Sequence, residues 1–232
     1  MKTLYSRTGP FTERPYYEVK DIETICADEL RAVGLYPSKP EPVRIDRFIE
    51  KRFGVTARYE DLPEGVLGYT KFGAKGVEAI VVARSLSEEG TQPAERRISA
   101  TLAHEGGHGL LHAHLFALGT KPKSLFDDAD QDMPQILCRS VTGEGPAKNL
   151  YSGRWWEFQA NQAIGALLLP GDLVEQALAP YFVNQGSLGV KTLDFSRREE
   201  AVMALSEIFD VNPVVARIRV DQMYGEEHQL GL

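Results

Sequence analysis

The segment 100–112, Ala-Thr-Leu-Ala-His-Glu-Gly-Gly-His-Gly-Leu-Leu-His, decides how the rest of the chain is interpreted. It lies within residues 96–118, whose apolar side chains recur at helical spacing. On a helix, His104 and His108 are one turn apart, about 40° from each other around the axis, and share an apolar stripe. Buried imidazoles without partners lose their hydrogen bonds to water, whereas one metal ion satisfies both rings.

The same motif, His-Glu-x-x-His, also supplies a carboxylate. Glu105 lies about 100° from His104 on the helix, so its side chain can reach a water molecule bound to the metal. Gly106 and Gly107 each cost about 1 kcal/mol relative to alanine in a helix interior, so they predict close packing against this helix. The pentapeptide alone is moderately specific, and a satisfied histidine pair is the alternative.

A second helix, predicted over 155–169 and ended by Pro170-Gly171, supplies a third candidate ligand. Glu157 and Asn161 are four residues apart and share a face with apolar residues. A buried carboxylate needs a cation, a donor network or a metal, and the adjacent turns offer no matching cation. We therefore expect Glu157 to bind the metal, with a structural salt bridge to a distant residue as the alternative.

Two histidines and one glutamate leave one coordination position open, which is typical of catalytic zinc sites. Zinc lowers the pKa of bound water, and Glu105 would accept its proton as general base. This chemistry predicts hydrolysis of a peptide carbonyl. Manganese and iron suit the same ligands, so the sequence favours one zinc ion per chain without excluding them.

Three neighbouring features are given smaller roles. His112 follows one turn after His108, but successive turns drift by about 40°, so we expect it to support the site or to pack rather than to bind the metal. Cys138 could hold the zinc as an inhibitory thiolate, although a lone cysteine is more often a small buried hydrophobic residue. Trp155 and Trp156 either line a peptide cleft or pack in the core.

The remaining pattern predicts an α+β fold. Residues 1–18 are interpreted as a loosely held tail. Further predictions are helices over 19–33 and 43–53, a small antiparallel sheet over 55–82, a polar loop over 85–95, an insertion over 121–153, and a helical C-terminal region over 172–232 packed on a core of 19–171. The edge of the strand 77–82 is a candidate for pairing with an extended substrate.

The composition limits the function classes. The chain has 232 residues, 43% of them hydrophobic, and a formal net charge of −7, which argues against direct binding of nucleic acid and favours a protein or peptide partner. Arginines in the segment 195–220 are offset by acidic residues, so a DNA-binding helix-turn-helix is not expected there. Two distant cysteines, no export signal and no apolar run of about 20 residues favour a cytoplasmic protein without a membrane span.

Two stretches resemble the ImmA/IrrE family of His-Glu-x-x-His metallopeptidases: RRISATLAHEGGHGLLH over 96–112 and WEFQANQAIGALLLP over 156–170. A looser likeness extends upstream through 61–68 and 77–82. The resemblance implies a compact zincin with a metal-binding active-site helix, gives Glu157 the role of third ligand, and gives Asn161 a supporting role. It also implies regulatory cleavage, with a DNA-binding repressor on a separate chain as the candidate substrate.

Two features depart from the family pattern. Gly106-Gly107 stands where a larger residue usually precedes glycine, and the insertion 121–153 is longer than typical. Both bear on substrate choice more than on metal binding.

Three functions are compatible with these residues. The leading hypothesis is a zinc-dependent metallo-endopeptidase acting on a protein substrate. The second is a regulatory or antitoxin-like protein that is stabilised by the metal and displaces a partner without cutting it. The third is an amidohydrolase acting on a small molecule, which would need a deep closed pocket. The substrate, the trigger for activity and the oligomeric state are left open by the sequence.

Overall fold

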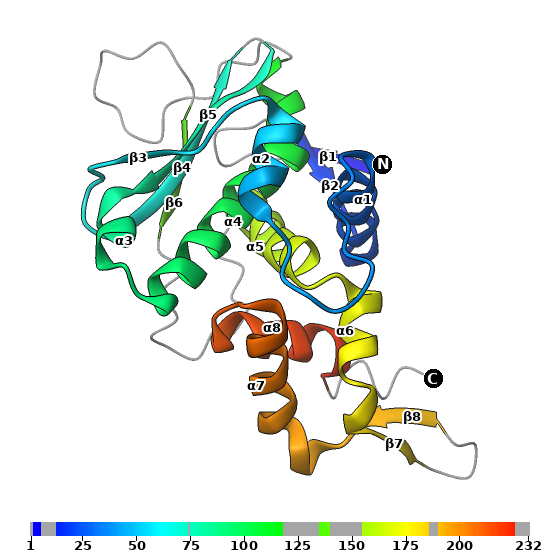
Figure 1. Cartoon of the computed structure of the whole chain (residues 1–232). Coiled ribbons are helices and arrows are strands. Elements are labelled where there is room, and N and C mark those ends of the chain that lie inside the picture. Colours follow the sequence, from blue (N-terminus) through cyan, green and yellow to red (C-terminus); the bar gives the residue numbers. More distant parts are fainter. Residues whose placement is uncertain are drawn as a thin grey trace.

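The computed structural model describes residues 2–5, 13–73, 75–117, 135–139, 155–185 and 190–225, which form a mixed α+β structure (Figure 1). The α-helices are α1 (Val19–Ala32), α2 (Ile45–Phe53), α3 (Arg84–Glu89), α4 (Gln92–Ala117), α5 (Trp155–Leu168), α6 (Gly171–Ala177), α7 (Arg198–Phe209) and α8 (Pro213–Tyr224). The strands are β1 (Lys2–Tyr5), β2 (Glu13–Tyr16), β3 (Arg58–Glu60), β4 (Val66–Gly73), β5 (Gly76–Ala83), β6 (Gln135–Arg139), β7 (Phe182–Gln185) and β8 (Val190–Leu193).

The main sheet has the strand order β3-β5-β4-β6. Strand β4 pairs antiparallel with both β5 and β6, but β3 pairs parallel with β5. The prediction of a purely antiparallel sheet was therefore wrong, because β3 reaches β5 by a non-local pairing that alternation along the chain does not reveal. The predicted free edge at 77–82 is occupied in part, since β3 pairs with residues 81–83 of β5. Its last five residues are all buried, as a central strand requires.

Helix α4 lies between this sheet and the helices on its other side (Figure 1). It packs against β4 and β5 on one side and against α5 and α2 elsewhere, while α1 packs on α5. The predicted helices over 19–33, 43–53, 96–118 and 155–169 are confirmed, with ends within a few residues of those expected. Gly34 and Gly54 adopt the positive φ angles of 69° and 71° that end α1 and α2. The prediction of a loop over 85–95 was wrong, because most of these residues belong to α3 or to the first turn of α4.

The regions near both chain ends contain strands that the sequence pattern did not predict. Strands β1 and β2 pair as an antiparallel hairpin in the segment interpreted as a tail. The C-terminal region contains the hairpin β7–β8 as well as the expected helices α6, α7 and α8. Of the insertion 121–153, only 135–139 is described, as β6. None of the described helices is both long and apolar enough to cross a membrane.

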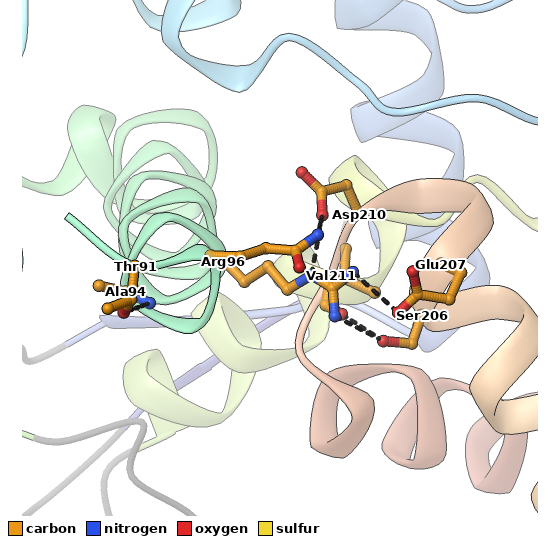
Figure 2. Close-up of polar contacts among 8 residues, drawn as sticks. Thr91, Ala94, Arg96, Ser206, Glu207, Asp210 and Val211 are labelled. Carbon is orange, nitrogen blue, oxygen red and sulfur yellow. Dashed lines mark hydrogen bonds and ion pairs between the residues drawn. The ribbon is translucent and has the colours of Figure 1, made fainter.

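A buried arginine fastens the C-terminal helices to α4 (Figure 2). Arg96, only 8% exposed, donates from Nε to Asp210 Oδ1 over 2.8 Å and from Nη2 to Glu207 Oε1 over 3.1 Å. Its Nη1 donates to Ser206 Oγ over 3.3 Å. Asp210 ends α7 at a φ angle of 49° and begins the turn into α8. The end of α7 and its turn into α8 are therefore bound to α4 through Glu207 and Asp210.

Candidate metal centre

His104, His108 and Glu157 direct their ligand atoms toward one point, with all of these atoms within 4.8 Å of one another. His104 Nε2 lies 3.1 Å from His108 Nε2 and 3.2 Å from Glu157 Oε2, and His108 Nε2 lies 3.7 Å from Glu157 Oε1. Both histidines are buried, whereas 18% of the Glu157 side chain is exposed, so the group is not sealed from the surface. This group could hold a metal ion.

The close approach of α4 to α5 creates this geometry. A Cβ atom added at Gly107 would lie 2.7 Å from Ala163 Cβ and 3.3 Å from the Ala160 carbonyl oxygen, both on α5. At Gly106 the nearest atom would be Ile49 Cδ1 on α2, at 3.0 Å. The predicted close packing around the two glycines is confirmed. Gly107 lets α5 come near enough for Glu157 to reach the histidines.

The charge state of the cluster favours a cation. Burial lowers the pKa of His108 well below its usual value, and the nearby His104 and His112 lower it further. A neutral imidazole offers a lone pair, which is the form that binds metals. Glu157 makes its ion-pair contacts with the two histidines and, among the described residues, with no lysine or arginine. The cluster therefore combines three lone-pair donors, one of them on a carboxyl group.

Glu105 lies beside the cluster on α4, and a residue of the sheet holds it. Thr70 on β4 donates its hydroxyl hydrogen to Glu105 Oε2 over 2.7 Å, and both residues are fully buried. The neighbouring Gly68 allows β4 to run this close, because a Cβ atom there would lie 2.6 Å from Thr101 Cγ2 and 2.7 Å from the Val81 carbonyl oxygen. Sequence reasoning missed Thr70, whose only signal was a polar residue at an inward-facing strand position.

His112 extends the cluster away from the ligand atoms. Its Nδ1 lies 3.0 Å from His108 Nδ1, and its Nε2 lies 3.0 Å from Gln159 Oε1. The amide nitrogen of Gln159 in turn donates to the carbonyl oxygen of Pro15 over 2.9 Å. Burial lowers the pKa of His112 to about 3. His112 thus lies beside His108, while its contacts with Gln159 and, through it, with Pro15 were not anticipated.

The other candidates are placed less centrally. Asn161 lies one turn after Glu157 on α5, and its side chain is exposed, so the supporting role that the resemblance implies for it stays a prediction. Trp155 and Trp156 are both buried in a small cluster with Phe72 and Leu115, which is core packing. The backbone of Cys138 pairs with Gly68 in the sheet, but its side chain lies outside the described part of the structure.

Comparison with protein-family models and with curated protein sequences gives no match for this chain.

Proposed function

We propose that the chain is a zinc-dependent metallo-endopeptidase that hydrolyses a protein substrate. The observation that supports this most strongly is the convergence of His104 Nε2, His108 Nε2 and a Glu157 carboxylate oxygen, with Glu105 on the same helix. Three protein ligands leave a position open, as catalytic rather than structural zinc sites do. The arrangement of α4 against a small mixed sheet is compatible with the zincin fold that the sequence resemblance implies.

In this proposal, His104, His108 and Glu157 would hold a zinc ion, which would supply Lewis acidity to the scissile carbonyl and to a water molecule. Glu105 takes a proton from the attacking water and passes it to the leaving amine. The hydrogen bond from Thr70 fixes the direction of the Glu105 carboxylate before substrate arrives. Because both residues are fully buried, this orientation is kept by packing as well as by the hydrogen bond.

The proposed substrate is a protein, with a DNA-binding repressor on a separate chain as the first candidate and the cytoplasm as the expected location. The net charge of −7 is compatible with this choice, because contacts to nucleic-acid phosphates require an excess of lysine and arginine.

The test compares zinc-loaded wild type with Glu105→Gln, incubated with proteome-derived peptides and with native cell extract. Mass spectrometry of new N-termini reports cleavage. Glu105→Gln should bind zinc like the wild type but cleave about 100- to 10,000-fold more slowly, since it lacks the general base. It should also retain an uncut substrate in pull-down experiments. Absence of new N-termini with zinc-loaded wild type would instead favour the non-cleaving regulatory protein, and equal cleavage by both proteins would contradict Glu105 as the general base.

A further inference from the structure

We infer that His112, Gln159 and the main-chain carbonyl of Pro15 form a relay that sets the tautomer of His108 and thereby positions it for metal binding. This inference rests on the proposed metal site, but it assigns roles to residues outside the ligand set. It also makes strand β2, near the start of the chain, a functional part of that site.

The direction of the relay follows from hydrogen-bonding chemistry, beginning at its far end. The carbonyl oxygen of Pro15 can only accept, so it must face the NH₂ group of Gln159, 2.9 Å away. This fixes the amide orientation and turns Oε1 of Gln159 toward His112 Nε2, at 3.0 Å. Because Oε1 can only accept, Nε2 of His112 carries the hydrogen.

The next step places the hydrogen between the two rings. His112 is fully buried, and its outer partner is an uncharged amide, so a second proton on the ring would be an uncompensated buried charge. Its Nδ1 is then an acceptor. The 3.0 Å separation between the Nδ1 atoms of His112 and His108 therefore requires the hydrogen on His108 Nδ1. The lone pair of His108 Nε2 is left facing His104 and Glu157, as metal coordination requires.

The absence of charge in the relay limits what it can do. Metal-bound histidines often donate their second hydrogen to a carboxylate, which orients the ring and also raises its basicity. Here the acceptor is a neutral imidazole, and the chain of bonds ends on a main-chain carbonyl. The relay therefore fixes the ring orientation and the tautomer of His108. The carboxyl group in contact with the two histidine rings is that of Glu157, which is not part of the relay.

The relay also joins three separate segments. His108 and His112 belong to α4, while Gln159 lies on α5 two residues after the ligand Glu157. Pro15 belongs to β2, which pairs with β1. Loss of the contact between β2 and α5 would free the Gln159 amide to rotate, and with it the hydrogen positions of both histidines.

The experiment uses His112→Leu and Gln159→Met, which remove the relay, and His112→Asn, whose Oδ1 can still accept from His108 Nδ1. Gln162→Met is the matched control, because Gln162 is another buried amide on α5 and has no place in the relay. Zinc affinity is measured by competition with a chelator. The tautomer of His108 is measured separately, in metal-free protein, from the ¹⁵N shifts of labelled histidine.

We expect His112→Leu to weaken zinc binding by about 10- to 100-fold, the usual effect of losing an outer partner of a ligand. Gln159→Met should also weaken zinc binding. His112→Asn should recover part of the zinc affinity that His112→Leu loses, and Gln162→Met should bind zinc as the wild type does. Metal-free wild type should carry the His108 hydrogen on Nδ1, and His112→Leu should move it toward Nε2.

Either of two results would overturn the inference: a folded His112→Leu variant with wild-type zinc affinity, or a wild-type His108 with its hydrogen on Nε2. Failure of the proposed function would look different. In that case wild type would bind no zinc or cleave nothing, while the NMR measurement on metal-free protein would still report whether the relay sets the tautomer.

Discussion

Helix α4 carries two buried polar clusters about two turns apart, and they are built on opposite principles. Near its start, the Arg96 guanidinium meets Asp210, Glu207 and Ser206, so a positive charge has acceptors around it (Figure 2). Further along, His104 and His108 meet each other and Glu157. The first cluster pairs its charges within the protein, and we call it the clamp because it joins α4 to the end of α7. The second brings three ligand atoms within 3.1–3.7 Å of one another, an arrangement that a bound cation would stabilise.

The contrast shows how a structural polar cluster can be told from a ligand-binding one. Burial alone does not separate them, because Arg96 and the two histidines are all buried. What differs is that a permanent cation, the Arg96 guanidinium, pairs with the carboxylates of the first cluster, whereas Glu157 contacts no lysine or arginine among the described residues. Each cluster can therefore be perturbed separately, and the two should respond in different observables.

The largest effect is expected on metal affinity. Glu157→Ala should weaken zinc binding by more than about 100-fold, beyond the usual effect of losing an outer partner, because it removes a ligand and the carboxylate charge. Arg96→Met should leave zinc affinity unchanged. Competition with a chelator measures both, and equal losses in the two variants would contradict the division between the clusters.

Stability of the metal-free protein should show the reverse pattern. Arg96→Met removes charge-assisted hydrogen bonds and should lower the free energy of unfolding by about 2 kcal/mol. Glu157→Ala should have a smaller effect, because Glu157 is partly exposed and pairs with no lysine or arginine in the described part of the chain. Urea unfolding in the presence of a chelator tests this, and the comparison fails if Glu157→Ala is the more destabilising change.

The helix contact that brings the ligands together can be tested with two adjacent glycines. Gly107→Ala places a Cβ against Ala163 Cβ and the Ala160 carbonyl. This overpacking costs about 1–3 kcal/mol, offset by about 1 kcal/mol of helix propensity. Gly106→Ala meets the movable tip of Ile49 and should be close to neutral. Zinc affinity should fall for Gly107→Ala alone, and equal behaviour of the two variants would contradict a special role for Gly107.

The smallest effect is a pH dependence at the clamp. The hydrogen bond from Arg96 holds the pKa of Asp210 below its ordinary value of 3.8. A lowered carboxyl pKa gives stability that is present above the unfolded-state value and is lost as the pH falls through the folded-state value. Asp210→Asn, which suits the same left-handed backbone, should therefore destabilise the protein more at pH 7 than at pH 3 in urea unfolding. An equal or larger effect at pH 3 would contradict this assignment.

Much of the helical structure could be predicted because its signals are local. The spacing of apolar residues gave α1, α2, α4 and α5, and glycines marked the ends of α1 and α2. The position of β3 beside β5 could not be predicted in this way, since a parallel pairing between separate segments leaves no local periodicity. The hairpins β1–β2 and β7–β8 have strands of four residues, too short for alternation to stand out.

In the candidate site too, the residues with local signals could be predicted and those with non-local contacts could not. His104, His108 and Glu105 were predicted from their spacing on one helix, and Glu157 was predicted from its position as a carboxylate among apolar residues. Asn161 lies four residues after Glu157 but faces solvent. A step of four residues rotates the side-chain direction by about 40° around the helix axis. Thr70 and Gln159 act through partners on other elements, and Pro15 contributes a main-chain oxygen. Any residue type can supply such an oxygen, so no sequence pattern marks it.

The most direct test of the central claim is the metal content of wild-type protein purified without chelators, measured by elemental analysis beside His108→Ala. We predict about one zinc per chain in the wild type, as expected for a three-ligand site, and none in the variant. Wild type that contains no metal, and takes up none when zinc is added, would show that the convergence of His104, His108 and Glu157 does not make a metal site.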